Sequence, residues 1–295
     1  MPEGMILKGI GGLYSVRDPH GIHQCRASGL LRKDGMTPLP GDRVAFDVTD
    51  AREKEGYITS ILPRTNTFIR PAVSNIQQAV IVLSVKNPPP DYLLADKLLC
   101  LFQMNDVRSI LCINKSDLAS EQEISLIMKQ YEKAGCPILV TDILTEKGVD
   151  PLFEVLKGNT TVLAGQSGVG KSSLLNKVIG YRHMETGSLS ERVQKGKHTT
   201  RHAEFIEAFG GYVVDTPGFS TLDVGLLDVD RIKNCYNEFE GYQESCRFNG
   251  CMHMEEPGCA VKQAVEQKDI PGERYERYLW IHDSALQSTR KKRGY

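Results

Sequence analysis

Residues 161–172 read TVLAGQSGVGKS, and this stretch decides the fold of the middle of the chain. The apolar run Thr161–Ala164 leads into Gly165–Ser172, which fits the pattern G-x-x-x-x-G-K-[ST], and a helix-like segment follows. Its glycines let backbone N–H groups turn inward around a β-phosphate, and the helix N-terminus adds partial positive charge. Lys171 is expected to reach the β- and γ-phosphates as a catalytic group, and Ser172 to bind magnesium. The predicted phosphate-binding residues are Gly165, Gln166, Ser167, Gly168, Val169, Gly170, Lys171, Ser172 and Ser173. The alternative is a glycine-rich strand-to-helix turn without a ligand.

The segments around this loop alternate between apolar runs and helix-like stretches. The apolar runs are Ala79–Val85, Ser109–Ile113, Pro137–Val140 and Thr161–Ala164, and the helical stretches are Tyr92–Met104, Glu121–Ala134 and Pro151–Leu156. This alternation is typical of a parallel sheet with helices on both faces. Two further runs, Phe205–Phe209 and Tyr212–Val214, flank Gly210-Gly211 and predict a hairpin that adds one antiparallel edge strand.

The N-terminal segment has the pattern of a small β-barrel. Four candidate strands, separated by turn residues, are Ile6–Leu13, Ile22–Arg26, Arg43–Val48 and Tyr57–Leu62. Several short strands in so few residues favour a barrel of the five-stranded OB type. Arg64–Pro71 is expected to be a linker, and the chain is expected to be helical from about Leu226.

Composition limits the classes of protein to which the chain can belong. Its 295 residues are 40% hydrophobic and 25% charged, with a formal net charge of -1, so the chain can bury a core and lacks a globally basic coat. The start of the sequence does not resemble a signal peptide, and the longest apolar run is too short to span a bilayer. We expect a soluble, cytoplasmic protein without a membrane partner.

Asn114-Lys115-Ser116-Asp117 follows a predicted buried strand and indicates which base is bound. An aspartate carboxylate accepts hydrogen bonds from guanine N1–H and the exocyclic amine, whereas adenine presents an acceptor at N1. Asp117 would therefore select guanine, and Lys115 can lay its alkyl stem along the base. The alternative is an Asx-type turn in which Asp117 caps a helix.

Asp215-Thr216-Pro217-Gly218 follows the last predicted strand. Asp215 is placed to hold magnesium through water, and the Gly218 N–H to sense the γ-phosphate. The polar segment 188–202 would be ordered when a hydroxyl, Thr199 or Thr200, completes the magnesium shell; the alternative is a plain exposed connection.

Phe219 occupies the position at which many GTPases carry a water-orienting glutamine, and it cannot orient water. His198 is the best local candidate for that role, and Thr200 is counted with it as catalytic. The alternative for His198 is a solvated loop histidine. Without a strong internal residue, the isolated enzyme should be slow and should depend on a partner.

Four ligand-type residues, Cys246, Cys251, His253 and Cys259, form a C-x4-C-x-H-x5-C cluster. Three thiolates and one imidazole satisfy a closed, structural zinc site, with one zinc per chain. The alternatives are reduced, buried cysteines, or competition from Cys235 as a ligand.

The order of the motifs is unusual, because the base-reading Asn114–Asp117 precedes the phosphate loop. Both can face one nucleotide if the sheet is circularly permuted. The motifs follow in the order NKSD, GQSGVGKS, HTTR and DTPG, and they lie between an N-terminal barrel and a C-terminal cysteine and histidine cluster. In this arrangement the chain resembles the circularly permuted GTPases of the bacterial small-ribosomal-subunit biogenesis family. This family is known as RsgA, YjeQ or YloQ. Val140-Thr141-Asp142 occupies the position of the family's base-backing loop but departs from its usual Ser-Ala type.

The resemblance implies a GTP hydrolase that binds the 30S subunit and its 16S rRNA and acts late in its maturation. It implies magnesium with GTP, products GDP and phosphate, stimulation by the subunit and the same four zinc ligands. The expected domains are a barrel (1–68), a circularly permuted GTPase domain (69–224) and a helical zinc-binding domain (225–295). A monomer is the default.

Three alternatives remain open at this level. The chain could be a GTP-dependent RNA-binding factor acting elsewhere in translation, a small-molecule kinase, or a zinc-containing RNA-binding module whose nucleotide site is only structural. The basic run Arg290–Arg293 could contact phosphates or could be a solvated terminus.

Overall fold

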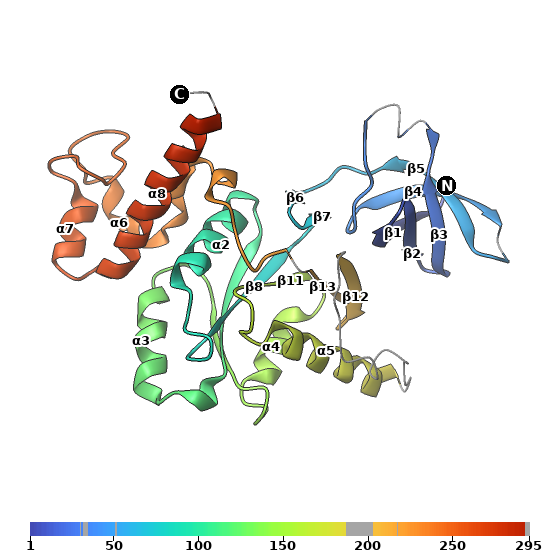
Figure 1. Cartoon of the computed structure of the whole chain (residues 1–295), viewed down its shortest axis with the longest axis horizontal. Coiled ribbons are helices and arrows are strands. Elements are labelled where there is room, and N and C mark those ends of the chain that lie inside the picture. Colours follow the sequence, from blue (N-terminus) through green and yellow to red (C-terminus); the bar gives the residue numbers. More distant parts are fainter. Residues whose placement is uncertain (30, 32–34, 51, 187–202, 217, 293–295) are drawn as a thin grey trace. The chain divides into compact units, whose positions relative to one another are not determined.

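The computed structural model describes residues 1–29, 31, 35–50, 52–186, 203–216 and 218–292, and for residues 181–186 it describes the backbone alone. The chain forms two compact units. The first comprises Met1–Ala79, Leu152–Leu163 and Ser172–Phe219, and the second comprises Val80–Pro151, Ala164–Lys171 and Ser220–Tyr295. Both units contain strands and helices (Figure 1).

Five strands of the first unit build the predicted barrel. They are β1 (Glu3–Ile10), β2 (Leu13–Asp18), β3 (Gly21–Ala27), β4 (Arg43–Asp50) and β5 (Glu55–Ile61). Antiparallel pairing joins β1 to β2, β2 to β3 and β4 to β5, β3 pairs with β5 in parallel, and β1–β4 pairing closes the barrel. Alternate apolar residues point inward and form a buried core that includes Ile6, Val16, Val44, Phe46 and Ile58.

The predicted first strand, Ile6–Leu13, is wrong in its extent. Gly11 and Gly12 have φ angles of 59° and 80°, and they form the turn between β1 and β2, with Ile10 opposite Leu13. A two-residue turn with both angles positive suits the twist of a hairpin, and glycine adopts it without strain. The glycines therefore separate two strands where the hydrophobic pattern suggested one.

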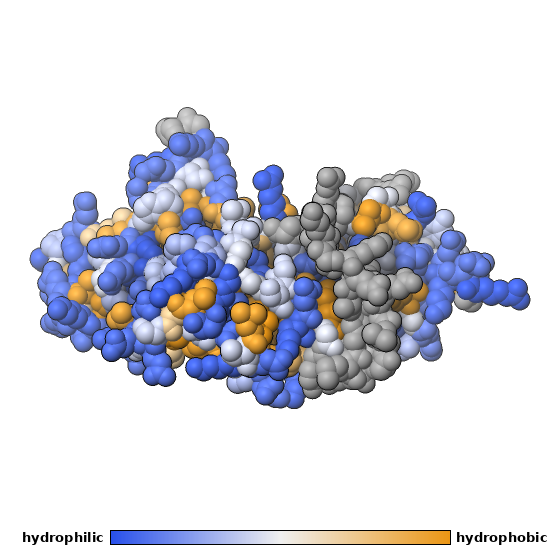
Figure 2. Space-filling view, turned by 60° about the horizontal axis from the view of Figure 1, so that its bottom comes forward, coloured by the Kyte–Doolittle hydropathy of each residue, from blue (hydrophilic) through white to orange (hydrophobic). Residues whose placement is uncertain are grey.

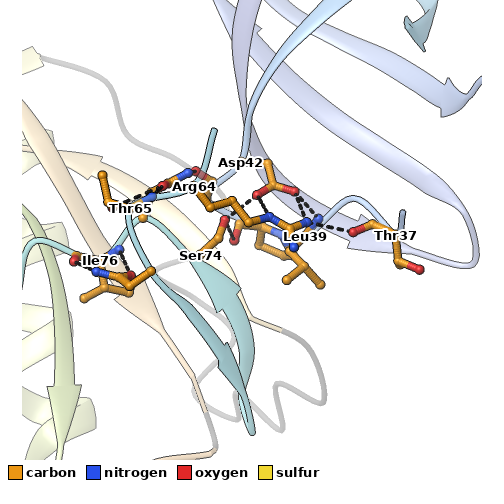
Figure 3. A network of polar contacts seen from close by, with 11 residues as sticks. Thr37, Leu39, Asp42, Arg64, Thr65, Ser74 and Ile76 are labelled. Carbon is orange, nitrogen blue, oxygen red and sulfur yellow. Dashed lines mark hydrogen bonds and ion pairs between the residues drawn. The ribbon is translucent and has the colours of Figure 1, made fainter. Parts of the chain in front are cut away.

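The segment expected to be a linker carries a short antiparallel hairpin, β6 (Thr67–Ile69) and β7 (Ala72–Ser74), and is fixed to the barrel (Figure 3). The anchor is Asp42, which is fully buried. Its carboxylate accepts hydrogen bonds from Arg64 Nε (2.7 Å) and Nη2 (2.8 Å), from Ser74 Oγ (2.6 Å) and from the Leu39 amide (2.7 Å). A buried carboxylate with four donors ties the chain after β5 to the loop before β4.

The first unit also contains β12 (Glu204–Ala208), β13 (Gly211–Asp215) and all but one end residue of β11 (Thr160–Ala164) and of helix α5 (Lys171–Thr186). β11 and β13 are parallel, and β12 is antiparallel to β13, as the Gly-Gly hairpin predicted. The predicted position of β12 at the sheet edge is wrong, because its other side pairs with β1 of the barrel at Lys8 and Glu204. The ion pairs Lys8–Glu204 (3.1 Å) and Arg17–Glu207 (3.3 Å) reinforce this junction.

The second unit contains β8 (Gln78–Ser84), β9 (Arg108–Asn114) and β10 (Ile138–Thr141), in the order β10-β9-β8. β9 and β10 are parallel, and every residue of β8 is buried, as a parallel sheet covered on both faces requires. The helices that follow β8 and β9 are α2 (Tyr92–Met104) and α3 (Glu121–Tyr131), and α4 (Val149–Leu156) follows β10.

The C-terminal part of the second unit consists of short 3₁₀ segments followed by helices. These are η3 (Val224–Leu226), η4 (Val229–Cys235), η5 (Asn237–Phe239), α6 (Glu240–Gln243), α7 (Ala260–Glu266) and α8 (Gly272–Lys292). Figure 1 shows α8 beside α2. Arg290 and Lys292 of the expected basic tail belong to the last turn of α8, where positive charge suits the helix dipole.

On the face drawn in Figure 2, hydrophobic residues form separate patches between hydrophilic ones. Among the described helices, none combines the length and the apolar character needed to cross a membrane.

Candidate functional site

The phosphate loop has the backbone that its glycines predicted. Gly165, Gly168 and Gly170 have φ angles of 130°, 82° and 102°, in a region that other residues rarely adopt. A Cβ on Gly165 would lie 2.2 Å from the carbonyl oxygen of Val82, and one on Gly170 would lie 2.3 Å from Asn114 Nδ2. Both the conformation and the close packing therefore require glycine.

Lys171 lies across this loop at the start of α5. Its Nζ donates to the carbonyl oxygens of Gly165 and Gln166, each at 2.6 Å. Burial lowers the pKa of this lysine to about 8, because the surroundings solvate the ammonium less well than water does. The side chain is thus already held beside the backbone that would surround a phosphate.

Asn114 connects the base-reading motif to the phosphate loop. Its Nδ2 donates to the carbonyl of Val169 (2.8 Å), and its Oδ1 accepts from Thr141 Oγ1 (3.0 Å). All three groups are buried, so this chain of hydrogen bonds fixes the orientation of the Asn114 amide. Sequence reasoning gave Thr141 no such role, since the contact joins the ends of two strands 27 residues apart.

Lys115 makes a second connection between the two motifs. Its Nζ donates to the carbonyl of Gly168 (2.8 Å) and to the carbonyl of Asn87. Asn87 follows β8 and was not predicted to belong to the site. Three loops, after β8, after β9 and after β11, thus meet at one place in the second unit.

Asp117 lies in η1 (Ser116–Leu118) and is exposed. The alternative that it caps the next helix does not hold, because Ser120 caps α3 in a capping box with Glu123. The carboxylate of Asp117 is therefore available to a ligand at the carboxyl end of β9.

The remaining predicted nucleotide contacts lie in the first unit or outside the described residues. Ser172 and Ser173 belong to α5, Asp215 ends β13, and Gly218 follows it. A Cβ on Gly218 would lie 2.5 Å from Pro71, so this position also requires glycine. The catalytic candidates His198 and Thr200, with the segment 188–202, lie outside the described residues.

Phe219 is buried, and its ring contacts the Phe68 ring edge to face at a centroid distance of 5.6 Å. The side chain after Gly218 is thus part of the hydrophobic core.

The predicted metal ligands Cys246, Cys251, His253 and Cys259 come together, with their ligand atoms within 4.8 Å of one another. Cys246 Sγ lies 3.9 Å from Cys259 Sγ, and His253 Nδ1 lies 3.6 Å and 3.5 Å from these two sulfurs. The four residues can hold a metal ion. Cys235 is not among them, since its sulfur faces the carbonyls of Cys100 and Arg231.

Surrounding residues hold the metal-binding loop in shape. Glu256 accepts from the amides of Met252 (2.7 Å) and Met254 (2.8 Å), and the Tyr275 hydroxyl donates to the carbonyl of His253 (2.7 Å). Burial raises the pKa of the Cys251 thiol to about 12, so binding of a metal must release a proton there. These outer contacts hold the main chain of the loop that carries the ligands.

Comparisons with known proteins agree with this geometry. The family model described as RsgA GTPase matches residues 61–225, and the model of the RsgA N-terminal domain matches residues 3–58. The small ribosomal subunit biogenesis GTPase RsgA of Ruminiclostridium cellulolyticum is 44% identical over 285 residues, covering 96% of this chain and 93% of the relative. The protein of the same name from Clostridium perfringens strain 13 is 46% identical, covering 94% and 96% of the two chains.

Two solved structures have the same fold over nearly the whole chain. YloQ, described as a circularly permuted GTPase, gives a TM-score of 0.81 at 36% identity and covers 97% of this chain and 96% of its own. YjeQ from Thermotoga maritima gives a TM-score of 0.82 at 33% identity, with coverages of 97% and 98%.

Proposed function

The chain belongs to the RsgA family of GTPases, and on that premise we propose that it hydrolyses GTP to GDP and phosphate on the small ribosomal subunit, late in the maturation of that subunit. The observation that carries the proposal is the contact of Asn114 and Lys115 with Val169 and Gly168. A base-reading motif that precedes the phosphate loop in sequence is packed onto that loop, as a permuted GTPase requires. The related proteins from clostridia carry the ribosomal function in their name.

Guanine is recognised by Asp117. The exposed carboxylate accepts from N1–H and the exocyclic amine, and adenine would leave it facing a lone pair. The aliphatic stem of Lys115 lies along the base while its ammonium holds Gly168 and Asn87.

The phosphates are held by backbone amides of Gly165–Lys171 and by the Lys171 ammonium, which exchanges its two carbonyl partners for phosphate oxygens. Ser172, Thr200 and, through water, Asp215 are the residues we assign to magnesium. Magnesium bound there would neutralise negative charge that develops on the phosphates during hydrolysis.

The attacking water has no orienting side chain next to Gly218, because Phe219 is in the core. We assign the role to His198, assisted by Thr200, and we infer that the ribosomal subunit brings these residues toward the γ-phosphate. Slow basal turnover and stimulation by the subunit follow.

The metal is zinc, one per chain, in a structural site. A tetrahedral zinc with bonds of about 2.3 Å to sulfur and about 2.0 Å to nitrogen separates its ligand atoms by roughly 3.5 to 3.8 Å. The sulfur–sulfur distance of 3.9 Å and the nitrogen–sulfur distances of 3.5 and 3.6 Å support that assignment. Four protein ligands leave no open position for catalysis.

The proposed domains are the barrel (1–68), the GTPase domain (69–224) and the zinc-binding domain (225–295). We further propose that the protein is a cytoplasmic monomer and that 16S rRNA is its contact on the subunit. The other candidate function is that of a GTP-dependent RNA-binding factor elsewhere in translation.

A turnover assay tests the function. Phosphate release from GTP is measured for the full chain alone, with purified 30S subunits and with 50S subunits. The proposal expects stimulation by 30S subunits only. Stimulation by 50S subunits or translation complexes alone would favour the other candidate, and binding of GTP without turnover under any condition would indicate a structural nucleotide site.

A further inference from the structure

The loop that follows β10 is closed by one buried carboxylate. Asp142 is 2% exposed, and its oxygens accept hydrogen bonds from the amides of Leu144 (2.9 Å) and Thr145 (3.3 Å) and from the Thr145 hydroxyl. Its own amide donates to the carbonyl of Lys147 (2.8 Å). The side chain of Asp142 therefore holds the start of the turn 142–147, and its main-chain amide closes the far end.

This loop lies beside the nucleotide site. Thr141, the residue before it, is hydrogen-bonded to Asn114, and the loop residue Ile143 places its Cδ1 3.9 Å from the position of a Cβ on Gly170. β10 is the parallel neighbour of β9, whose carboxyl end leads to Asp117. Ligands of such sheets bind outside the carboxyl ends of the strands, where these two loops are adjacent.

The hydrogen-bonding groups on the edge of guanine determine which groups the loop must supply. Asp117 takes the two donors of the base edge, N1–H and the exocyclic amine, and the neighbouring O6 is an acceptor that needs a donor. In the described part of the chain, the Ile143 amide donates to no acceptor. A carboxylate pointing at O6 would repel it, so the turn can suit guanine only if the charge of Asp142 is directed elsewhere.

The hydrogen bonds of Asp142 direct its charge toward its own loop. Three donors of the loop itself occupy the carboxylate, so its charge is directed at the loop. Burial raises the pKa of Asp142, but the hydrogen bonds from Thr145 and Leu144 and the charge of Lys147 outweigh it and lower the pKa overall. The side chain stays ionised at neutral pH and binds its loop with charge-assisted hydrogen bonds.

We propose that Asp142 is a positioning residue for guanine recognition, which holds the loop 143–147 beside Asp117 with its backbone toward the O6 edge. The proposal rests on the proposed function, in which Asp117 binds the base. The side chain of Asp142 holds the loop by accepting hydrogen bonds from Leu144 and Thr145.

The test compares binding of GDP and of 6-thioguanosine diphosphate, whose sulfur is a poor hydrogen-bond acceptor, by calorimetry on the full chain. Asp142→Ala should raise the Kd of GDP about tenfold or more, since an ordered donor is lost, and should change the Kd of the thio analogue less than threefold. Asp142→Asn keeps an acceptor oxygen toward the loop and should stay within about threefold of the original protein. Asp50→Ala is the matched control, because Asp50 closes an exposed turn of the barrel through the amides of Arg52 (2.8 Å) and Glu53 (3.1 Å).

Equal weakening of both nucleotides in Asp142→Ala, or none, would overturn the proposal, because the loop would then contribute nothing specific to O6. If Asp142→Ala does not fold, Thr145→Val, which removes only the hydroxyl donor, should show the same selective loss at smaller size. Failure of the proposed function is separate: it would appear as an unaltered chain that binds ADP as well as GDP.

Discussion

Arg274 Nη1 lies 2.6 Å from Asp96 Oδ1, and this buried ion pair joins α8 to α2. The same guanidinium donates to Glu238 through Nε at 2.6 Å, and Arg277 Nε donates to the other oxygen of Asp96 at 2.6 Å. The rings of Tyr131 and Tyr236 lie 5.0 and 4.6 Å from the Arg274 guanidinium carbon. Two arginines and two carboxylates thus form a neutral cluster between the C-terminal helices and the helix that follows β8.

Arg274→Met should destabilise the second unit strongly. Removing one partner of a buried ion pair leaves Asp96 and Glu238 as uncompensated charges, which costs roughly 3 to 5 kcal/mol. The urea midpoint is read from the fluorescence of Trp280, the single tryptophan, which lies on the same helix. Lys157→Ala is the control, because Lys157 pairs with Glu154 at the same 2.6 Å on the surface and should cost less than about 1 kcal/mol. Similar midpoint shifts in the two variants would contradict a special role for burial.

Asp117→Asn should shift nucleotide preference from GTP toward xanthosine triphosphate. The amide offers a donor in place of an acceptor, which suits the additional carbonyl of xanthine and opposes the amine of guanine. Competition binding at fixed magnesium measures the two affinities, with Asp50→Asn as an exposed control outside the site. Equal GTP affinity in Asp117→Asn and the unaltered chain would exclude Asp117 as the base-reading residue.

Cys251→Ala should lower the zinc content well below one per chain and reduce the stability reported by Trp280, while GDP affinity stays nearly unchanged. The thiolate is one of four ligands that share one ion, so its loss opens the site. Cys235→Ala is the matched control, since it removes another cysteine of low exposure that lies outside the cluster. Metal analysis that finds full occupancy in Cys251→Ala, or equal loss in Cys235→Ala, would rule out this ligand set.

The features predicted from the sequence are those with a local signal. The phosphate loop, Asn114–Asp117 and the cysteine cluster each depend on spacing within about fifteen residues, and the structure gathers them as expected. Contacts between distant residues leave no such pattern. Arg274 and Asp96 are 178 residues apart, and the pairing of Lys8 with Glu204 makes β12 an inner strand although its sequence reads as an edge.

Asp142 illustrates the same limit within the site. Its departure from the family's Ser-Ala type is visible in the sequence, but the role of the side chain depends on which groups donate hydrogen bonds to its carboxylate. Only the fold shows that Leu144 and Thr145 are the donors.

Small ribosomal subunits should accelerate GTP turnover by a factor of order 10² or more, a partial effect compared with the factors of about 10³ to 10⁵ by which partners accelerate other GTPases. The physical reason is that Phe219 is buried, so the side chain at the position after Gly218 is not available to orient the attacking water. His198→Ala should lower stimulated turnover without weakening GDP binding, as loss of a contact made only in the transition state would. A change of less than twofold on adding purified 30S subunits would contradict the mechanism, and an unaffected His198→Ala would remove this histidine from it.

The barrel should supply much of the binding energy for this stimulation. Deleting residues 1–68 should abolish stimulation while basal hydrolysis survives, but the deletion also removes β1 from β12 and Asp42 from Ser74. A more selective change is Tyr57→Ala with Arg26→Glu. These two exposed residues are neighbours in the β3–β5 register and present an aromatic face and a positive charge.

Stacking of one base on an aromatic side chain is worth about 1 to 3 kcal/mol, so the 30S concentration for half-maximal stimulation should rise about tenfold or more in this barrel variant, with unchanged basal turnover. Lys129→Glu on the exposed face of α3 makes a comparable change in charge outside the barrel and should leave the concentration dependence as it was. Two results would assign the binding energy to another part of the chain. One is half-maximal stimulation of the barrel variant at the same 30S concentration as the unaltered protein, and the other is stimulation of the truncated protein as strong as that of the intact one. Because both Tyr57 and Arg26 are exposed, loss of stimulation with an unaltered melting temperature separates a lost contact from a lost fold.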